Sequence, residues 1–307
     1  MFIKRLTEGA LVIGAPAKVN LYLEVLRKRP DGYHDINSAF QAVSLFDTLR
    51  CERTQDPGVL LTLEDSNGLP TDERNLAVKA FHLMRESFGL DGGMRITLTK
   101  RIPIAAGLAG GSSDAAAVMI ATNILYDLGL PGSTLAQVGA GIGSDIPFFF
   151  TRGQAIVGGR GEIIDEVELP VDYWLVLVTP DFGISTAESY ARLRMILTNS
   201  KNPFKLSRCV RVEELIESIK LSDNDFSKVH ALSYPELETI EDELIKHGAV
   251  MARLSGSGPT VFGIFLRAPE VEEDEEFQRG DWQVHTVRPI TLPIISDLQL
   301  GGNRGDN

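Results

Sequence analysis

A glycine-rich segment, 103–114 (PIAAGLAGGSSD), is the part of the sequence best suited to bind a phosphate. It follows a strand-like alternation of apolar and polar residues over 94–101 and precedes a run of small residues with helical character. Gly107, Gly110 and Gly111 let the backbone approach an anion without a Cβ in the way. The first turn of the helix adds unpaired N–H groups and the positive end of its dipole. The segment therefore predicts a phosphate-binding loop.

This segment matches neither of the two common nucleotide signatures. The Walker motif needs a lysine after its glycines, and the dinucleotide fingerprint G-x-G-x-x-G is absent. A tight turn with a serine N-cap is the simplest alternative. The strand–loop–helix context favours phosphate binding, but it does not identify the rest of the ligand.

Strands and helices that would position this loop are spread along the whole chain. Strand patterns occur at 19–25, 60–64, 94–101, 173–179, 249–254, 260–265 and 282–287. Helical patterns occur at 75–88, 114–128 and 235–247, and a glycine follows each of them. The pattern changes near 158–162 (GGRGE), which predicts a domain boundary between about 155 and 175. We set it at 160, giving domains 1–160 and 161–295 and a polar tail, 296–307.

Composition excludes several classes of protein. The 307 residues carry a formal net charge of −12, and no basic face for a nucleic acid is evident. No window has the ~18 uninterrupted apolar residues of a membrane span. The two cysteines, Cys51 and Cys209, are too few for a disulfide framework or a zinc site, which predicts a reduced, cytoplasmic protein. An anionic ligand would therefore need a local positive field from backbone N–H groups, lysines or a metal ion.

Four further segments identify a resemblance. They are 15–21 (APAKVNL), 29–34 (RPDGYH), 143–149 (GSDIPFF) and 254–259 (LSGSGP). With the glycine-rich segment between them, their order and spacing resemble the GHMP kinase superfamily. Within it, the chain is similar to the branch that phosphorylates a cytidine-diphosphate-linked methylerythritol in the non-mevalonate isoprenoid pathway. The segments 15–25 and 29–34 carry this finer resemblance, because the whole superfamily shares the glycine-rich loop.

The resemblance implies a two-domain α+β fold with the active site in the cleft between the domains. The N-terminal domain, 1–160, would carry the ATP loop, and 161–295 would be the C-terminal GHMP kinase domain. The implied ATP-binding residues are Pro103, Ile104, Ala105, Ala106, Gly107, Leu108, Ala109, Gly110, Gly111, Ser112 and Ser113.

Lys18 and Asp145 are the catalytic pair that the resemblance implies. Phosphoryl transfer depends mainly on positioning and charge stabilisation. Asp145 would accept the proton of the C2 hydroxyl of the methylerythritol moiety, and Lys18 would orient Asp145 and polarise the reacting groups. Each has a simpler alternative, because Asp145 could cap a turn and Lys18 could be a surface lysine.

The cytidine group of the substrate needs a flat pocket with hydrogen-bonding groups. Tyr33 can stack on a pyrimidine, and His34 can offer a ring nitrogen to the edge of the base. Tyr190 is a candidate for the opposite face of the base, and Asn20 is a further candidate for substrate contact. A tyrosine at the end of a strand is otherwise most often a packing residue.

The expected ligands are ATP with Mg²⁺ and a small molecule that carries a cytidine diphosphate group, with neither nucleic acid nor membrane as partner. Mg²⁺ would be held mainly by phosphate oxygens and water, so no side chain is predicted as a metal ligand. We expect a monomer or a weak homodimer. Two rival functions are a kinase for mevalonate, homoserine or a sugar, and a sensor without catalysis. The segment 29–34 argues against the first rival, and the presence of both Lys18 and Asp145 argues against the second.

Overall fold

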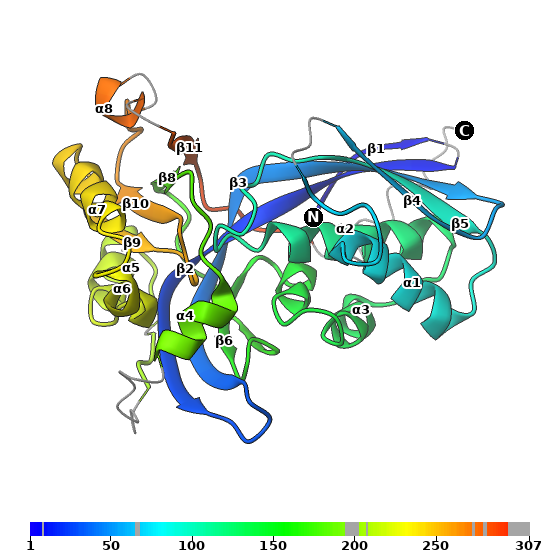
Figure 1. The fold of residues 1–307 in the computed structure, drawn as a ribbon, viewed down its shortest axis with the longest axis horizontal. Helices are drawn as coiled ribbons and strands as arrows, with labels where there is room; N and C mark the ends of the chain where they lie inside the picture. Colours follow the sequence, from blue (N-terminus) through cyan, green and yellow to red (C-terminus); the bar gives the residue numbers. More distant parts are fainter. Residues whose placement is uncertain are drawn as a thin grey trace.

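The computed structural model describes residues 1–7, 9–64, 68–193, 203–206, 208–271, 274–278 and 281–293. Within them the chain forms two β-sheets, each with its own group of helices (Figure 1). This arrangement confirms the α+β class. The predicted tail, 296–307, lies outside the described residues.

The first sheet has seven strands and holds most of the N-terminal half of the chain. The order is β1-β2-β3-β5-β4, and β6 joins it through β3 and carries β7 on its other side. Only β4 and β5 among these pairs run parallel, because α1 connects them. The strands are β1 (Phe2–Thr7), β2 (Ala10–Lys28), β3 (His34–Thr54), β4 (Gly58–Glu64), β5 (Gly93–Thr99), β6 (Gln154–Gly158) and β7 (Ile163–Glu166).

Helices α1 to α3 lie along one face of this sheet (Figure 1). They are α1 (Leu76–Phe88), α2 (Gly110–Leu125) and α3 (Gly132–Gly139), followed by the 3₁₀-helix η1 (Ile146–Phe150). The side chain of Asn75 accepts a hydrogen bond from Ala77 N at 2.9 Å, and Gly89 ends α1 in the left-handed conformation, so the prediction for 75–88 is confirmed. Helix α2 begins four residues before the predicted Asp114, so its first turn contains Gly110 and Gly111.

The second sheet has four antiparallel strands in the order β11-β8-β10-β9. Helices α5 to α7 pack beside it, on the opposite side of the molecule from α1 to α3 (Figure 1). The strands are β8 (Trp174–Thr179), β9 (Met251–Leu254), β10 (Val261–Phe265) and β11 (Gln283–Val287). The helices are α4 (Thr186–Leu193), α5 (Val212–Ile219), α6 (Asp225–His230), α7 (Glu236–Lys246) and α8 (Glu275–Gln278).

Strands β2 and β3 form a long ribbon that runs from the first sheet toward the second (Figure 1). Their register shifts between Pro16 and Ala17, between Asn20 and Tyr22, and again near the hairpin end. Such bulges bend a strand and increase its twist, so the ribbon can curve between the two parts. The middle of β2 therefore lies where the two halves of the molecule meet.

A short stretch of chain connects the two sheets. Strand β7 still pairs with β6 in the first sheet, and β8 begins the second. The boundary at residue 160 stays a prediction.

No helix within the described residues has the length and apolar character that a bilayer crossing requires.

Candidate active site

A cavity of about 930 Å³ lies between the two parts of the molecule. It is lined by the middle of β2, the start of β3, the glycine-rich loop and α2 on one side. Residues of α4 and of the loop between β9 and β10 line it on the other. Both catalytic candidates and all four substrate candidates line this cavity. The predicted site residues are therefore brought together in one cleft.

The glycine-rich loop lines the cavity mostly with glycine and alanine residues. Nine of its eleven predicted ATP-binding residues line the cavity, and the exceptions are Leu108 and Ser113, which are buried behind it. Ala105 and Ala109 have positive φ angles of 53° and 55°, as does Gly107 at 75°. Alternating backbone directions of this kind turn successive N–H groups toward one side, which suits an anion.

The loop rests directly on a second glycine-containing loop, which joins β9 to β10. Ser255 Oγ donates a hydrogen bond to Gly107 O at 3.1 Å, and Thr260 N donates one to Ala106 O at 3.3 Å. A Cβ on Gly107 would lie 2.1 Å from Ser255 O, and one on Gly256 would lie 3.1 Å from Gly107 O. The two loops approach so closely that neither glycine can carry a side chain in this arrangement.

Lys18 and Asp145 lie close together in the cleft. Lys18 Nζ lies 3.8 Å from Asp145 Oδ2 and donates hydrogen bonds to Asn20 Oδ1 at 2.6 Å and Gly107 O at 3.1 Å. It also lies 4.6 Å from the centre of the Phe40 ring. Burial lowers the pKa of the Lys18 ammonium, and the Asp145 carboxylate opposes that shift. Lys18 is thus a buried, fully partnered amine and not a surface lysine.

Asp145 begins η1, yet its side chain makes no capping hydrogen bond there. Its carboxylate is about one third exposed, toward the cavity. The simpler alternative of a turn-capping aspartate is therefore not what the structure shows. Asn20, two residues from Lys18 and on the same face of β2, is fixed in turn because its Nδ2 donates to Ser38 Oγ at 2.9 Å.

A buried cluster of Asp47, Lys100 and Asp114 supports the glycine-rich loop from below. Lys100 Nζ donates to both carboxylates, at 2.9 Å in the case of Asp114 Oδ2. Asp47 Oδ1 also accepts hydrogen bonds from the backbone N–H groups of Arg101 and Ile102, at 2.7 and 2.9 Å. The cluster therefore fixes both the strand that leads into the loop and the helix that follows it.

The charges of this cluster are unequal, because one lysine faces two carboxylates. Burial raises the pKa of Asp114 to about 8, and Lys100 only partly opposes that shift. Burial alone would lower the pKa of Lys100, but Asp114 and Asp47 outweigh it and raise that pKa. Neither aspartate was predicted from the sequence. Asp47 lies 53 residues from Lys100, and no local pattern marks it.

The hairpin between β2 and β3 carries Tyr33 and His34. Arg29 holds its turn through ion pairs to Asp31 at 3.0 Å and Asp35 at 2.8 Å. Tyr33 is 54% exposed at the cavity, whereas His34 is buried and stacks on Tyr190 with ring centres 5.0 Å apart. Those two rings are in direct contact, so no base fits between them. Tyr190 thus supports the face of His34, and its contact with the face of the base opposite Tyr33 stays a prediction.

The positive charge expected near an anionic ligand is present in the cavity. Its lining contains four basic residues, Lys18, Arg74, Lys100 and Arg160, and only two acidic ones, Asp114 and Asp145. This local field exists in a protein with a net charge of −12. We therefore expect a phosphorylated ligand to bind in this cleft.

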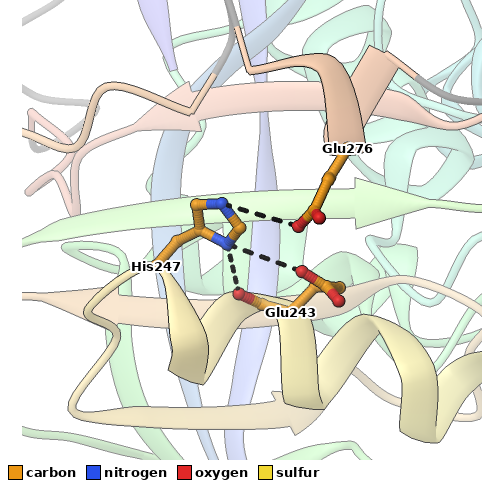
Figure 2. Close-up of side chains that lie close together, drawn as sticks. All are labelled: Glu243, His247 and Glu276. Atoms are coloured by element: carbon orange, nitrogen blue, oxygen red, sulfur yellow. Dashed lines mark hydrogen bonds and ion pairs between the residues drawn. The ribbon is translucent and has the colours of Figure 1, made fainter.

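A group of side chains with metal-ligand spacing lies elsewhere. Within the described part of the chain it consists of Glu243 and His247 on α7 and Glu276 on α8 (Figure 2). Lys246 Nζ already lies 3.3 Å from Glu243 Oε2 and 2.8 Å from Glu276 Oε2. Because the Lys246 ammonium already pairs with both carboxylates, we interpret the group as an ion-pair network that holds α8 on α7.

Comparisons with known proteins agree with this geometry. The chain matches the family profiles described as GHMP kinases N terminal domain, over residues 75–153, and GHMP kinases C terminal, over residues 207–279. It is 39% identical to 4-diphosphocytidyl-2-C-methyl-D-erythritol kinase of Geobacillus kaustophilus, covering 88% of this chain and 91% of the relative. It is 40% identical to the protein of the same name from Macrococcus caseolyticus, covering 90% of this chain and 98% of the relative.

Solved structures give the same picture. A crystal structure of 4-(cytidine 5'-diphospho)-2C-methyl-D-erythritol kinase superimposes with a TM-score of 0.72 at 30% identity, covering 90% of this chain and 99% of that one. A mevalonate kinase superimposes with a TM-score of 0.71 at 18% identity, covering 92% of this chain and all of that one, and it therefore supports the fold alone.

Proposed function

The chain belongs to the 4-diphosphocytidyl-2-C-methyl-D-erythritol kinases of the GHMP kinase superfamily, and from that premise we propose how its cleft carries out the transfer. It is a small-molecule kinase that uses ATP, with the two-domain α+β fold of the superfamily. The γ-phosphate of ATP is transferred to the C2 hydroxyl of 4-diphosphocytidyl-2-C-methyl-D-erythritol, giving the 2-phosphate and ADP. The observation that supports this reaction most is the position of the Lys18–Asp145 pair between an anion-binding loop and an aromatic pocket.

The donor side of the cleft binds ATP. The backbone of 103–109 and the N-terminus of α2 would surround the phosphates, and Ser112 adds a hydroxyl at the cavity. Lys100 adds positive charge at the base of the loop while Asp47 and Asp114 hold it in place. These groups fix the γ-phosphate before transfer, which is where most of the catalysis of phosphoryl transfer arises.

The transfer itself needs one proton acceptor and one positive charge. The C2 oxygen forms a bond to the γ-phosphorus, the bond from that phosphorus to the β-bridging oxygen breaks, and the hydroxyl proton passes to Asp145. ADP leaves with the electron pair. Lys18, held by Asn20 and Gly107, orients the Asp145 carboxylate and stabilises the charge on the transferred group.

Mg²⁺ is proposed to enter with ATP. No group of three potential metal ligands lines the cavity among the described residues, so phosphate oxygens and water would provide most of its ligands. Of the two loop serines, Ser112 lines the cavity and Ser113 is fully buried, so Ser112 is the nearer hydroxyl. When bound, the ion neutralises and orients the phosphates.

The acceptor side binds the cytidine end of the substrate. We assign the stacking surface to Tyr33 and the hydrogen bond at the edge of the base to His34, whose ring is held by Tyr190. Asn20 lies beside Lys18, where it can contact the methylerythritol moiety. The cytoplasmic location and the monomeric or weakly dimeric state stay predictions from the sequence.

A coupled ADP-release assay with ATP and Mg²⁺ tests the function. The acceptors are 4-diphosphocytidyl-2-C-methyl-D-erythritol, mevalonate and homoserine, each supplied separately. We expect turnover with the cytidyl substrate alone. Turnover of another alcohol would keep the kinase but contradict the proposed pocket. Measurable ATP binding without turnover of any alcohol would favour the sensor.

A further inference from the structure

Arg160 is unlike the other basic residues that line the cleft. Lys18 faces Asp145 at 3.8 Å, Lys100 is held between two aspartates, and Arg74 pairs with Asp72 at 2.8 Å. Among the described residues, no hydrogen bond or ion pair reaches the guanidinium of Arg160. The guanidinium lies over the Tyr33 ring, whose centre is 5.0 Å from Cζ. The Asp31 carboxylate is near enough to interact with Arg160 electrostatically, but it makes no direct ion pair with it. A half-buried guanidinium whose N–H groups are not hydrogen-bonded to a carboxylate is a ready partner for an anionic ligand.

The backbone holds Arg160 firmly in this position. It lies between Gly159 and Gly161, whose φ angles of 63° and 123° form a tight turn after β6. Gly159 O accepts a hydrogen bond from Ile36 N at 2.6 Å, which fixes the turn to the strand that carries His34. Arg160 N donates to Glu162 Oε2 at 2.7 Å. The position of this residue is thus set by the fold and does not depend on its own side chain.

The turn also touches the catalytic side of the cleft. A Cβ on Gly161 would lie 3.0 Å from the Ser144 Cβ and 3.6 Å from Asp145 Oδ1. Arg160 therefore contacts the Tyr33 ring on one side, and the next residue in its turn lies close to Asp145 on the other. In the substrate, the diphosphate lies between the same two ends, because it joins the cytidine to the methylerythritol.

We propose that Arg160 binds the diphosphate of the acceptor substrate and thereby sets the distance between the cytidine pocket and the reacting hydroxyl. This inference rests on the proposed function. A guanidinium can donate two parallel hydrogen bonds to phosphate oxygens while its flat face remains on an aromatic ring. Arg160 would thus be a specificity-determining residue that distinguishes a nucleoside diphosphate from an uncharged nucleoside.

The test compares two probes that differ only in the diphosphate, cytidine and cytidine 5'-diphosphate. Their dissociation constants are measured by calorimetry for the wild-type protein and for Arg160→Met, which keeps much of the side-chain length but removes the charge. We expect the affinity for cytidine 5'-diphosphate to fall about ten- to a hundredfold and that for cytidine to stay the same. Arg160→Lys should recover part of the loss, and Arg152→Met, an exposed arginine outside the cavity, should change neither.

Two results would overturn the proposal. Equal losses for both probes would mean that Arg160 only supports Tyr33, and an unchanged affinity for the diphosphate would mean that it makes no such contact. Failure of the kinase function is a separate result, since it would appear as a wild-type protein without turnover in the ADP-release assay. With the natural substrate, Arg160→Met should raise KM for the acceptor by a similar factor while KM for ATP stays constant.

Discussion

The two sides of the cleft bind their ligands by different means. The donor side is made of backbone: two loops packed so closely that a Cβ on Gly107 would lie 2.1 Å from Ser255 O, above a buried cluster of charges. The acceptor side is made of side chains on turns, where Tyr33 is 54% exposed and Arg160 has no ion pair among the described residues. A site made of backbone N–H groups can bind a phosphate whatever side chains the loop carries, provided that the loop can adopt its conformation. The specificity of a site made of side chains changes when a single residue is substituted.

The largest effect is expected where the two sides meet. Asp145→Asn should lower kcat by about 10²–10⁴-fold, because the amide cannot accept the hydroxyl proton, and should leave ATP affinity nearly unchanged. Single-turnover kinetics and nucleotide titration would measure both. Asp165→Asn, on an exposed position of β7, is the matched control. A variant that kept wild-type turnover would remove Asp145 from the mechanism.

On the donor side, Gly107→Ala should act through the fold. The new methyl group would clash with Ser255 O, and the φ angle of 75° is unfavourable for alanine, so we expect a loss on the order of 3 kcal/mol of unfolding free energy. Gly111→Ala is the stability control, because the nearest atom to its Cβ is Leu76 Cδ1 at 3.7 Å. Thermal unfolding would compare the two. Equal melting temperatures would show that the loops are packed less tightly than described.

On the acceptor side, His34→Ala should act on binding without a comparable effect on ATP. We expect KM for the cytidyl substrate to rise about tenfold, the value of one hydrogen bond to the base, with KM for ATP unchanged. His82→Ala, on α1 and outside the cavity, is the control. A parallel rise in KM for ATP would show that the donor and acceptor sides are coupled, and it would contradict the view that they bind their ligands independently.

The smallest effect concerns the charges beneath the donor loop. The pKa of Asp114 is raised from 3.8 to about 8, so the folded protein holds a proton that the unfolded chain releases. Stability should therefore fall as pH rises through that range. Asp114→Asn cannot titrate, so its melting temperature should change less between about pH 5 and pH 8 than that of the wild type. Identical pH profiles would mean that Asp114 is ionised in the folded protein.

Regular patterns made much of the fold predictable. The helix over 75–88 has a capping asparagine, an apolar stripe and a terminal glycine, and the structure reproduces it almost residue for residue. Strand β3 was not predicted, because buried polar residues such as Ser38, Gln41 and Asp47 interrupt its apolar pattern. Their partners come from other strands and loops, and so no local rule could anticipate that they are buried.

The site was predictable to a similar degree. The glycine-rich loop can be found from its own residues, whereas Lys18 and Asp145 became candidates only through a resemblance, since 127 positions separate them. Arg160 belongs to the segment 158–162 (GGRGE), whose pattern predicted a domain boundary and no role in binding. Its significance depends on Tyr33, a residue from a different hairpin, and on the lack of a direct ion pair to its guanidinium among the described residues.

The contact between the two glycine loops also determines when the ATP-binding loop can reach its final packing during synthesis of the chain. Gly107 rests on Ser255, and Ala106 accepts its hydrogen bond from Thr260, so the ATP loop depends on residues synthesised about 150 positions later. A nascent chain that ends before β9 lacks the surface against which the loop packs. We therefore expect nucleotide binding to develop only once most of the chain has been synthesised.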